Sequence, residues 1–193
     1  MSLAYLPVEV AHCSEIRHTP TDEFVSPFPA LDHAATKARF ERSRKSLEAG
    51  EWFAEFTAVL DATTFPAGIN KIVTFALSPI TRENDQEAMP GIARHALALA
   101  LRDILANNGK RQEPREIKCF AQDPIYSPVD QQVLAEAGFT VLDDPRAFLE
   151  VDENSVVIRI APHIPVRQII ADIARPAVMI WTALNAWDPH PYG

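Results

Sequence analysis

Several sequence features that mark common functional classes are missing from this chain of 193 residues. It has no G-x-x-x-x-G-K-[ST] loop, no G-x-S-x-G elbow and no C-x-x-C spacing. These are the usual marks of P-loop nucleotide binding, serine hydrolysis and thiolate metal sites. The two cysteines, Cys13 and Cys119, lie in very different contexts. We therefore expect reduced thiols and no metal site.

A surplus of basic residues is missing as well. The chain has 18 Lys and Arg against 26 Asp and Glu, a formal net charge of −8. Binding to a nucleic-acid backbone needs an excess of Lys and Arg, so we expect no nucleic-acid partner. No apolar run reaches membrane-spanning length, and the first ten residues lack a basic stretch with a long apolar core. We expect no membrane association and a soluble protein of the cytoplasm, the nucleus or both.

From Ile69 onward, strand and helix patterns alternate regularly. The run Ile72–Leu77 is almost wholly apolar and rich in β-branched and aromatic residues, which is typical of a strand buried on both faces. Further strands are expected at 116–121, 139–142, 156–161 and 177–181, and helices at 91–107, 128–137, 145–149 and 166–173. Helices of this length between strands imply parallel crossovers. The sequence predicts a Rossmann-like three-layer α/β/α sandwich with a mostly parallel sheet centred on Ile72–Leu77.

The first 68 residues follow a different pattern. Residues 1–31 carry several prolines and little periodicity, which predicts an irregular arm. A helix is expected from Asp32 to Ala49. Trp52, Phe56, Val59 and Leu60 favour a second helix that ends before Pro66, although residues 53–60 also fit a strand. We therefore predict an N-terminal arm and helical extension over 1–68 and an α/β domain over 69–193.

The first of these helices is strongly basic in an otherwise acidic protein. Its basic residues are Lys37, Arg39, Arg42, Arg44 and Lys45. Two interpretations stay open. The helix presents either a solvated face or a docking surface for an acidic protein partner.

Three loops are expected to gather at the carboxyl edge of the sheet, where ligands bind in such folds. The loop after the first strand carries Ser78 and Arg82, the loop after the second Asp123 and Tyr126, and the loop after the fourth His163. We predict a ligand pocket in which Asp123 accepts hydrogen bonds from hydroxyls, His163 is a switchable donor, Tyr126 is an apolar wall and Arg82 meets an anionic group. Two alternatives stay open: Asp123 starts an Asp-Pro turn and caps the next helix, and His163 bonds a neighbouring carbonyl.

The first of these loops argues against a tightly held dinucleotide. It reads Ala76-Leu77-Ser78-Pro79, without the glycine that lets a backbone approach a phosphate closely. No paired carboxylates stand at catalytic spacing. The sequence therefore assigns no catalytic residue and no cofactor.

Five short segments form a recognisable pattern: Ala76–Ser78, Ala93–Leu101, Asp123–Tyr126, Gly138–Leu142 and Pro162-His163. In their order and spacing they resemble the SRR1-like family (sensitivity to red light reduced-like). The resemblance runs from about Lys71 to Trp181. Two departures stand out: the family's Gly-x-Gly loop is replaced by Ala76 and Ser78, and a glutamine common early in the helix is replaced by Ala96.

The resemblance implies a regulatory protein and no defined reaction. Relatives are linked to circadian and light signalling in plants, and elsewhere to regulation of haem biosynthesis and to microtubule drug resistance. The main hypothesis is thus a regulatory protein that acts through a small molecule, a protein partner or both at the carboxyl-edge crevice. Two other classes stay open: an enzyme using a nucleotide-like cofactor such as adenosylmethionine or a dinucleotide, and a non-catalytic interaction module.

Overall fold

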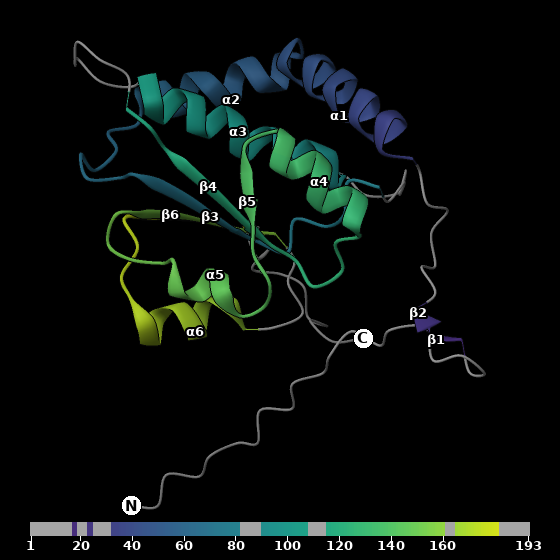
Figure 1. Cartoon of the computed structure of the whole chain (residues 1–193). Helices are drawn as coiled ribbons and strands as arrows, with labels where there is room; N and C mark the ends of the chain where they lie inside the picture. Colours follow the sequence, from purple (N-terminus) through teal and green to yellow (C-terminus); the bar gives the residue numbers. More distant parts are fainter. Residues whose placement is uncertain are drawn as a thin grey trace, which may run out of the picture.

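The protein is built on a five-stranded parallel sheet (Figure 1). The computed structural model describes residues 17–18, 23–24, 32–81, 90–107, 115–160 and 165–181. In chain order the strands of this sheet are β3 Lys71–Phe75, β4 Lys118–Gln122, β5 Phe139–Val141, β6 Ser155–Arg159 and β7 Val178–Trp181. Their order in space is β5-β4-β3-β6-β7. The predicted parallel sheet is confirmed, and the run that begins at Ile72 supplies its central strand, which ends at Phe75.

The central strand is buried on both faces, as its sequence predicts. Ile72 belongs to one apolar core and Val73 and Phe75 to the other, because successive side chains of a strand point to opposite faces. Thr74 is also buried, and its hydroxyl donates to the carbonyl of Phe120 at 3.1 Å. One strand therefore joins both cores of the domain.

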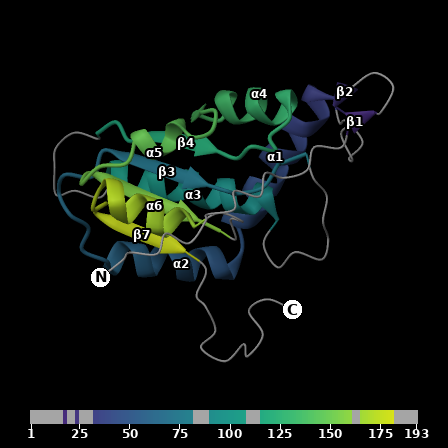
Figure 2. The ribbon, with the colours of Figure 1, turned by 90° about the horizontal axis from the view of Figure 1, so that it is seen from below.

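Helices cover both faces of the sheet (Figures 1 and 2). One face carries α1 His33–Glu48, α2 Glu51–Ala62, α3 Gly91–Asn107 and α4 Pro128–Glu136, and the other carries α5 Arg146–Leu149 and α6 Val166–Ile173. The predicted three-layer α/β/α sandwich is confirmed. None of the helices in the described ranges is long and apolar enough to cross a membrane.

The two N-terminal helices pack on the domain. Asp32 caps helix α1 as predicted, and its carboxylate accepts from Ala35 N at 2.8 Å. It packs on α3 and α4, while α2 packs on α3 and contributes Phe56 to the core that also contacts Ile180 of β7. The boundary between residues 68 and 69 stays a prediction. Of the N-terminal arm, only two short paired strands are described, β1 Arg17–His18 and β2 Glu23–Phe24.

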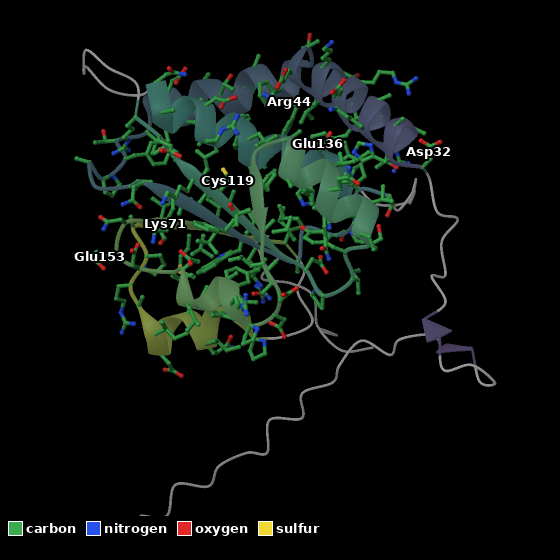
Figure 3. The ribbon with its side chains drawn as sticks, in the orientation of Figure 1. Asp32, Arg44, Lys71, Cys119, Glu136 and Glu153 are labelled. Carbon is green, nitrogen blue, oxygen red and sulfur yellow. The ribbon has the colours of Figure 1, made fainter. Side chains whose placement is uncertain are left out.

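Much of the basic character of α1 is used within the chain. Lys37 pairs with Glu136 at 2.7 Å, Arg44 pairs with Glu48 at 2.7 Å and Asp103 at 3.4 Å, and Arg39 donates to the carbonyl of Ile80. Figure 3 labels Arg44 and Glu136 on this side of the molecule. Arg42 and Lys45 are exposed and form no ion pair in the described part of the chain. A docking surface on α1, which stays a prediction, would therefore rest on Arg42 and Lys45.

Candidate functional site

The strand order reverses direction between β3 and β6. From the central strand the chain moves outward through β4 and β5 and then returns to the other side of β3 for β6 and β7. The connection after β3 leads to α3 on one face, and that after β6 leads to α6 on the opposite face (Figure 1). In open α/β sheets, ligands bind at the carboxyl ends of the strands where the order reverses. The carboxyl ends of β3 and β6 are therefore the candidate site.

The loop that leaves β3 has an unusual backbone. Ala76 and Ser78 have φ angles of 54° and 68°, in the left-handed region that residues with a Cβ rarely enter. Each such residue costs about 1 kcal/mol. Ala76 N donates to the carbonyl of Gln122 at 3.1 Å, which extends the pairing of β3 with β4. Strain of this kind persists only where surrounding contacts impose it, and it is concentrated at functional sites.

Side chains from β4 and α3 hold this loop in place. Ser78 N donates to Asp123 Oδ2 at 3.0 Å, and Arg94 Nη1 donates to Ser78 Oγ at 2.8 Å. The other carboxylate oxygen, Asp123 Oδ1, accepts from Ile125 N at 3.2 Å. Burial raises the pKa of Asp123, while the two backbone donors favour its charged form. Asp123 thus forms the expected turn, but the cap of the next helix is Ser127.

Asp130 fixes the far end of the same loop. This carboxylate is fully buried. It accepts from Thr81 N at 2.8 Å and Thr81 Oγ1 at 3.0 Å, and from Ser127 N at 2.8 Å and Ser127 Oγ at 2.6 Å. The two bonds from Ser127 belong to the capping box that begins α4. One buried carboxylate therefore ties the β3 loop to the start of α4.

Helix α3 starts in direct contact with the loop. A Cβ on Gly91 would lie 2.6 Å from the carbonyl oxygen of Pro79 and 2.8 Å from that of Ser78. No real side chain tolerates such distances, so only glycine allows the helix to begin here. The loop and the first turn of α3 therefore form one closely packed unit.

A buried polar chain lies beneath this unit. His95 Nδ1 is 2.7 Å from the carbonyl oxygen of Gly91, and His95 Nε2 is 2.7 Å from the hydroxyl of Tyr126. Since a carbonyl only accepts, Nδ1 carries the proton and the tyrosine hydroxyl donates to Nε2. Burial lowers the pKa of His95 to about 4 and raises the pKa of Tyr126. Both side chains are therefore neutral parts of the interior.

The structure brings together some of the predicted site residues. Ser78 and Asp123 touch, as the convergence of parallel strands predicts. Tyr126 belongs to the same region but is 7% exposed and hydrogen-bonded to His95, so it supports the loop from below. Arg82 and His163 lie outside the described residues.

Sequence reasoning missed three residues that hold the loop: Arg94, His95 and Asp130. Two signals were present. Arg94 and His95 interrupt the apolar face of α3, and Asp130 follows Ser127 at the spacing of a capping box. Among the described residues, no group of three His, Cys, Asp or Glu side chains is placed to hold a metal ion.

Comparison with known families adds one finding. The family model of the SRR1 domain matches residues 44–191. The chain belongs to the SRR1 domain family. The match includes the whole described sheet and begins within α1. No curated protein and no solved structure matches the chain.

Within this SRR1 domain, Ala76 and Ser78 have left-handed φ angles, a backbone conformation that is usual for glycine. The resemblance described above implies a Gly-x-Gly loop at these two positions in SRR1-like sequences. The backbone of this loop therefore fits the glycines that the resemblance implies.

Replacing Ala76 by glycine should stabilise the SRR1 domain. Glycine removes the steric cost of the left-handed φ, and part of this gain is offset by the larger entropy of the unfolded chain. We expect the free energy of unfolding in urea to rise by about 0.5 kcal/mol. The matched control is Ala58→Gly in the middle of α2, which should lower it by about 1 kcal/mol. A loss of stability in both variants would show that residue 76 is not strained.

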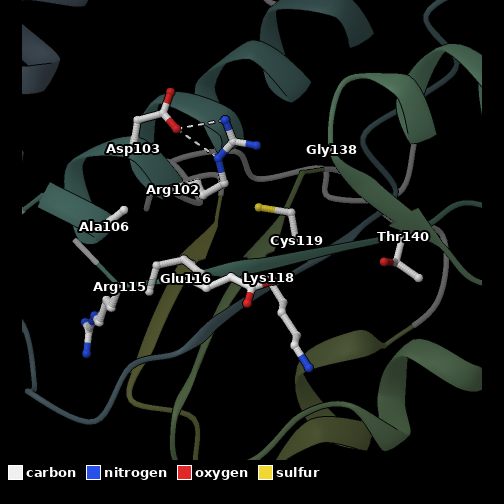
Figure 4. A pocket seen from close by; sticks show the side chains of 10 residues that line it. Arg102, Asp103, Ala106, Arg115, Glu116, Lys118, Cys119, Gly138 and Thr140 are labelled. Atoms are coloured by element: carbon white, nitrogen blue, oxygen red, sulfur yellow. Dashed lines mark hydrogen bonds and ion pairs between the residues drawn. The ribbon is translucent and has the colours of Figure 1, made fainter. Parts of the chain in front are cut away.

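A second candidate region lies at the opposite edge of the SRR1 domain sheet (Figure 4). A cavity of about 410 Å³ is bounded by the last turns of α3, the start of β4 and the start of β5. Arg102 in its wall is paired with Asp103 at 2.8 Å, and Arg115 donates to the carbonyl of Ala67 at 2.7 Å. Burial raises the pKa of the Cys119 thiol to about 12, so the thiol is protonated and unreactive. Three of its charged side chains, Arg102, Asp103 and Arg115, thus have partners within the chain, and the carboxyl edge remains the stronger candidate.

Proposed function

We propose that this SRR1-domain protein is a regulatory protein that binds a small molecule at the carboxyl ends of β3 and β6. The observation that carries the proposal is the reversal of strand order between these two strands. Roles in light and circadian signalling or in the control of haem biosynthesis come from the family resemblance and are part of the proposal. A regulatory role requires that the ligand change what the protein binds, so ligand binding is the first property to test.

The structure of the β3 loop supports this proposal. Four elements hold the loop: the end of β4 through Asp123, α3 through Arg94, α4 through Asp130 and α1 through Arg39. Such a loop is rigid before a ligand arrives, which lowers the entropic cost of binding. We propose that Ser78, Arg82, Asp123 and His163 contact the ligand and that Tyr126 supports them.

Two other functions compete with this one. An enzyme would use a nucleotide-like cofactor such as adenosylmethionine or a dinucleotide at the same edge, and it would turn over a substrate once the cofactor was bound. A non-catalytic interaction module would instead bind an acidic protein through Arg42 and Lys45 of α1, which are exposed. The regulatory protein and the enzyme both require a small molecule, whereas the interaction module does not.

A ligand panel followed by thermal unfolding tests the proposal. The panel contains nucleotides, dinucleotides, adenosylmethionine and haemin. A compound present at 100 times its Kd stabilises the folded protein by about 2.7 kcal/mol, which raises Tm by several degrees. We expect at least one compound to do so, and Asp123→Asn and His163→Ala to reduce the shift.

The matched control is the double variant Arg42→Ala/Lys45→Ala, which should respond to the compound like the natural chain. If the panel leaves Tm unchanged, or if the α1 variant alone loses the response, the small-molecule proposal is wrong. Conversion of the bound compound, measured by mass spectrometry, would favour the enzyme.

A further inference from the structure

A partly buried arginine lies at the carboxyl end of β6. Arg159 is the last residue of this strand and is in register with Phe75 of β3 on one side and Trp181 of β7 on the other. Val157, two residues earlier, belongs to the core beneath α5 and α6, so Arg159 points to the same face of the sheet. The side chain therefore lies where the strand order reverses, on the α6 side.

Within the part of the chain that the structure describes, the Arg159 side chain has no hydrogen-bonded or charged partner. Its Nε is buried and has no hydrogen bond, and none of the described carboxylates forms an ion pair with it. Asp144, which follows β5 at this edge, instead accepts from Gln122 at 2.7 Å. A buried N–H donor without a partner is costly, and native proteins rarely keep one without a reason.

A second arginine lies next to it. Arg167, in the first turn of α6, places its guanidinium carbon 4.9 Å from the ring centre of Trp181. Trp181 neighbours Arg159 across the β6–β7 pair, so the three side chains occupy one short stretch of the sheet edge. Arg167 is exposed, whereas Arg159 is partly buried. The two positive groups thus differ in how strongly they are fixed.

We propose that Arg159 and Arg167 bind the anionic group of the small molecule, a phosphate or a carboxylate. This inference rests on the proposed function and adds the chemical class of the ligand. An arginine fork matches either oxyanion with two parallel hydrogen bonds, which satisfies the buried Nε. Arg159 is the fixed anchor, and Arg167, lying on the ring of Trp181, closes on the same anion from the solvent side.

The experiment compares the natural chain with Arg159→Met, Arg167→Met and Arg175→Met. Arg175 follows the far end of α6 and is the matched control. The probes are inorganic phosphate, adenosine monophosphate, citrate and uncharged adenosine, each titrated while Tm is followed. The phosphate probes and citrate distinguish a phosphate from a carboxylate ligand.

Without a probe, Arg159→Met should raise Tm by about 2–4 °C, because an apolar side chain replaces a partly buried charge that has no partner among the described residues. We expect at least one anion to stabilise the natural chain, and Arg159→Met to weaken its binding on the order of 10- to 100-fold. Arg167→Met should weaken it less, and Arg175→Met should not change it.

Three results would overturn the inference. The first is a lower Tm of Arg159→Met without any probe, since this indicates that Arg159 has a structural role. The second is anion binding that Arg159→Met leaves unchanged, and the third is no response of the natural chain to any anion. If an uncharged compound stabilised both the natural chain and Arg159→Met, the small-molecule proposal would stand. Only the inference that the ligand is an anion would be wrong.

Discussion

Replacing Asp130 by alanine should lower the free energy of unfolding by about 4 kcal/mol. The substitution removes a fully buried acceptor of four hydrogen bonds and leaves Thr81 N and Ser127 N without this partner. It also separates the β3 loop from α4. Asparagine should rescue little, because its amide nitrogen would face these donors with a donor of its own. Urea unfolding of Asp130→Ala and Asp130→Asn measures both effects.

The control for this prediction is Asp172→Ala on the exposed side of α6, which should change stability by less than about 0.5 kcal/mol. A loss of less than about 1 kcal/mol in Asp130→Ala would mean that the loop does not depend on this carboxylate. The rigidity on which the proposed ligand site relies would then have no support.

The second large effect concerns pH. Burial lowers the pKa of His95 to about 4, whereas a histidine of the unfolded chain has a pKa near 6.5. Between these values the unfolded chain binds a proton that the folded protein does not, so stability falls as the pH falls. The slope approaches about 1.4 kcal/mol per pH unit, and the total loss from pH 6.5 to pH 4 is about 3 kcal/mol.

The variant His95→Gln isolates this contribution, because glutamine is neutral throughout the range and keeps a donor and an acceptor. Other titrating groups, Asp123 among them, are common to both proteins. The raised pKa of Asp123 acts in the opposite direction, because its contribution to stability is lost as the pH rises. The stability advantage of the natural chain over the variant should shrink from pH 7 to pH 4.5. Parallel pH profiles would indicate that folding does not lower the pKa of His95.

Most of the fold could be predicted from local patterns. The run beginning at Ile72 is apolar at every position except Thr74. A strand needs such a pattern only when both of its faces are buried. Strand ends were less predictable, since β3 stops at Phe75 where Ala76 takes a left-handed φ. The hydrophobic pattern does not reveal where the strand ends, because Ala76 and Leu77 continue the apolar run beyond Phe75.

Of the candidate site, only the meeting of loops at one edge of the sheet could be predicted, because it follows from the sheet topology. Parallel strands bring Ser78 and Asp123 to one edge, and the structure places them in hydrogen-bond contact. The hydrogen bond of Tyr126 to His95 depends on how α3 packs on β4, which no local pattern encodes. That Arg159 Nε has no partner among the described residues depends on the packing of the side chains around it, which only the three-dimensional structure shows.

The amide spectrum of the natural chain, titrated with the anion that raises Tm most, tests the central claim most directly. Nitrogen-15 labelling reports each backbone N–H separately, so the binding place is read without a substitution. We expect the chemical-shift changes to concentrate in residues 75–81 and 158–160 and at the start of α6. Changes concentrated instead at 102–106 and 115–119, around the cavity of Figure 4, or along α1 would contradict a ligand site between β3 and β6.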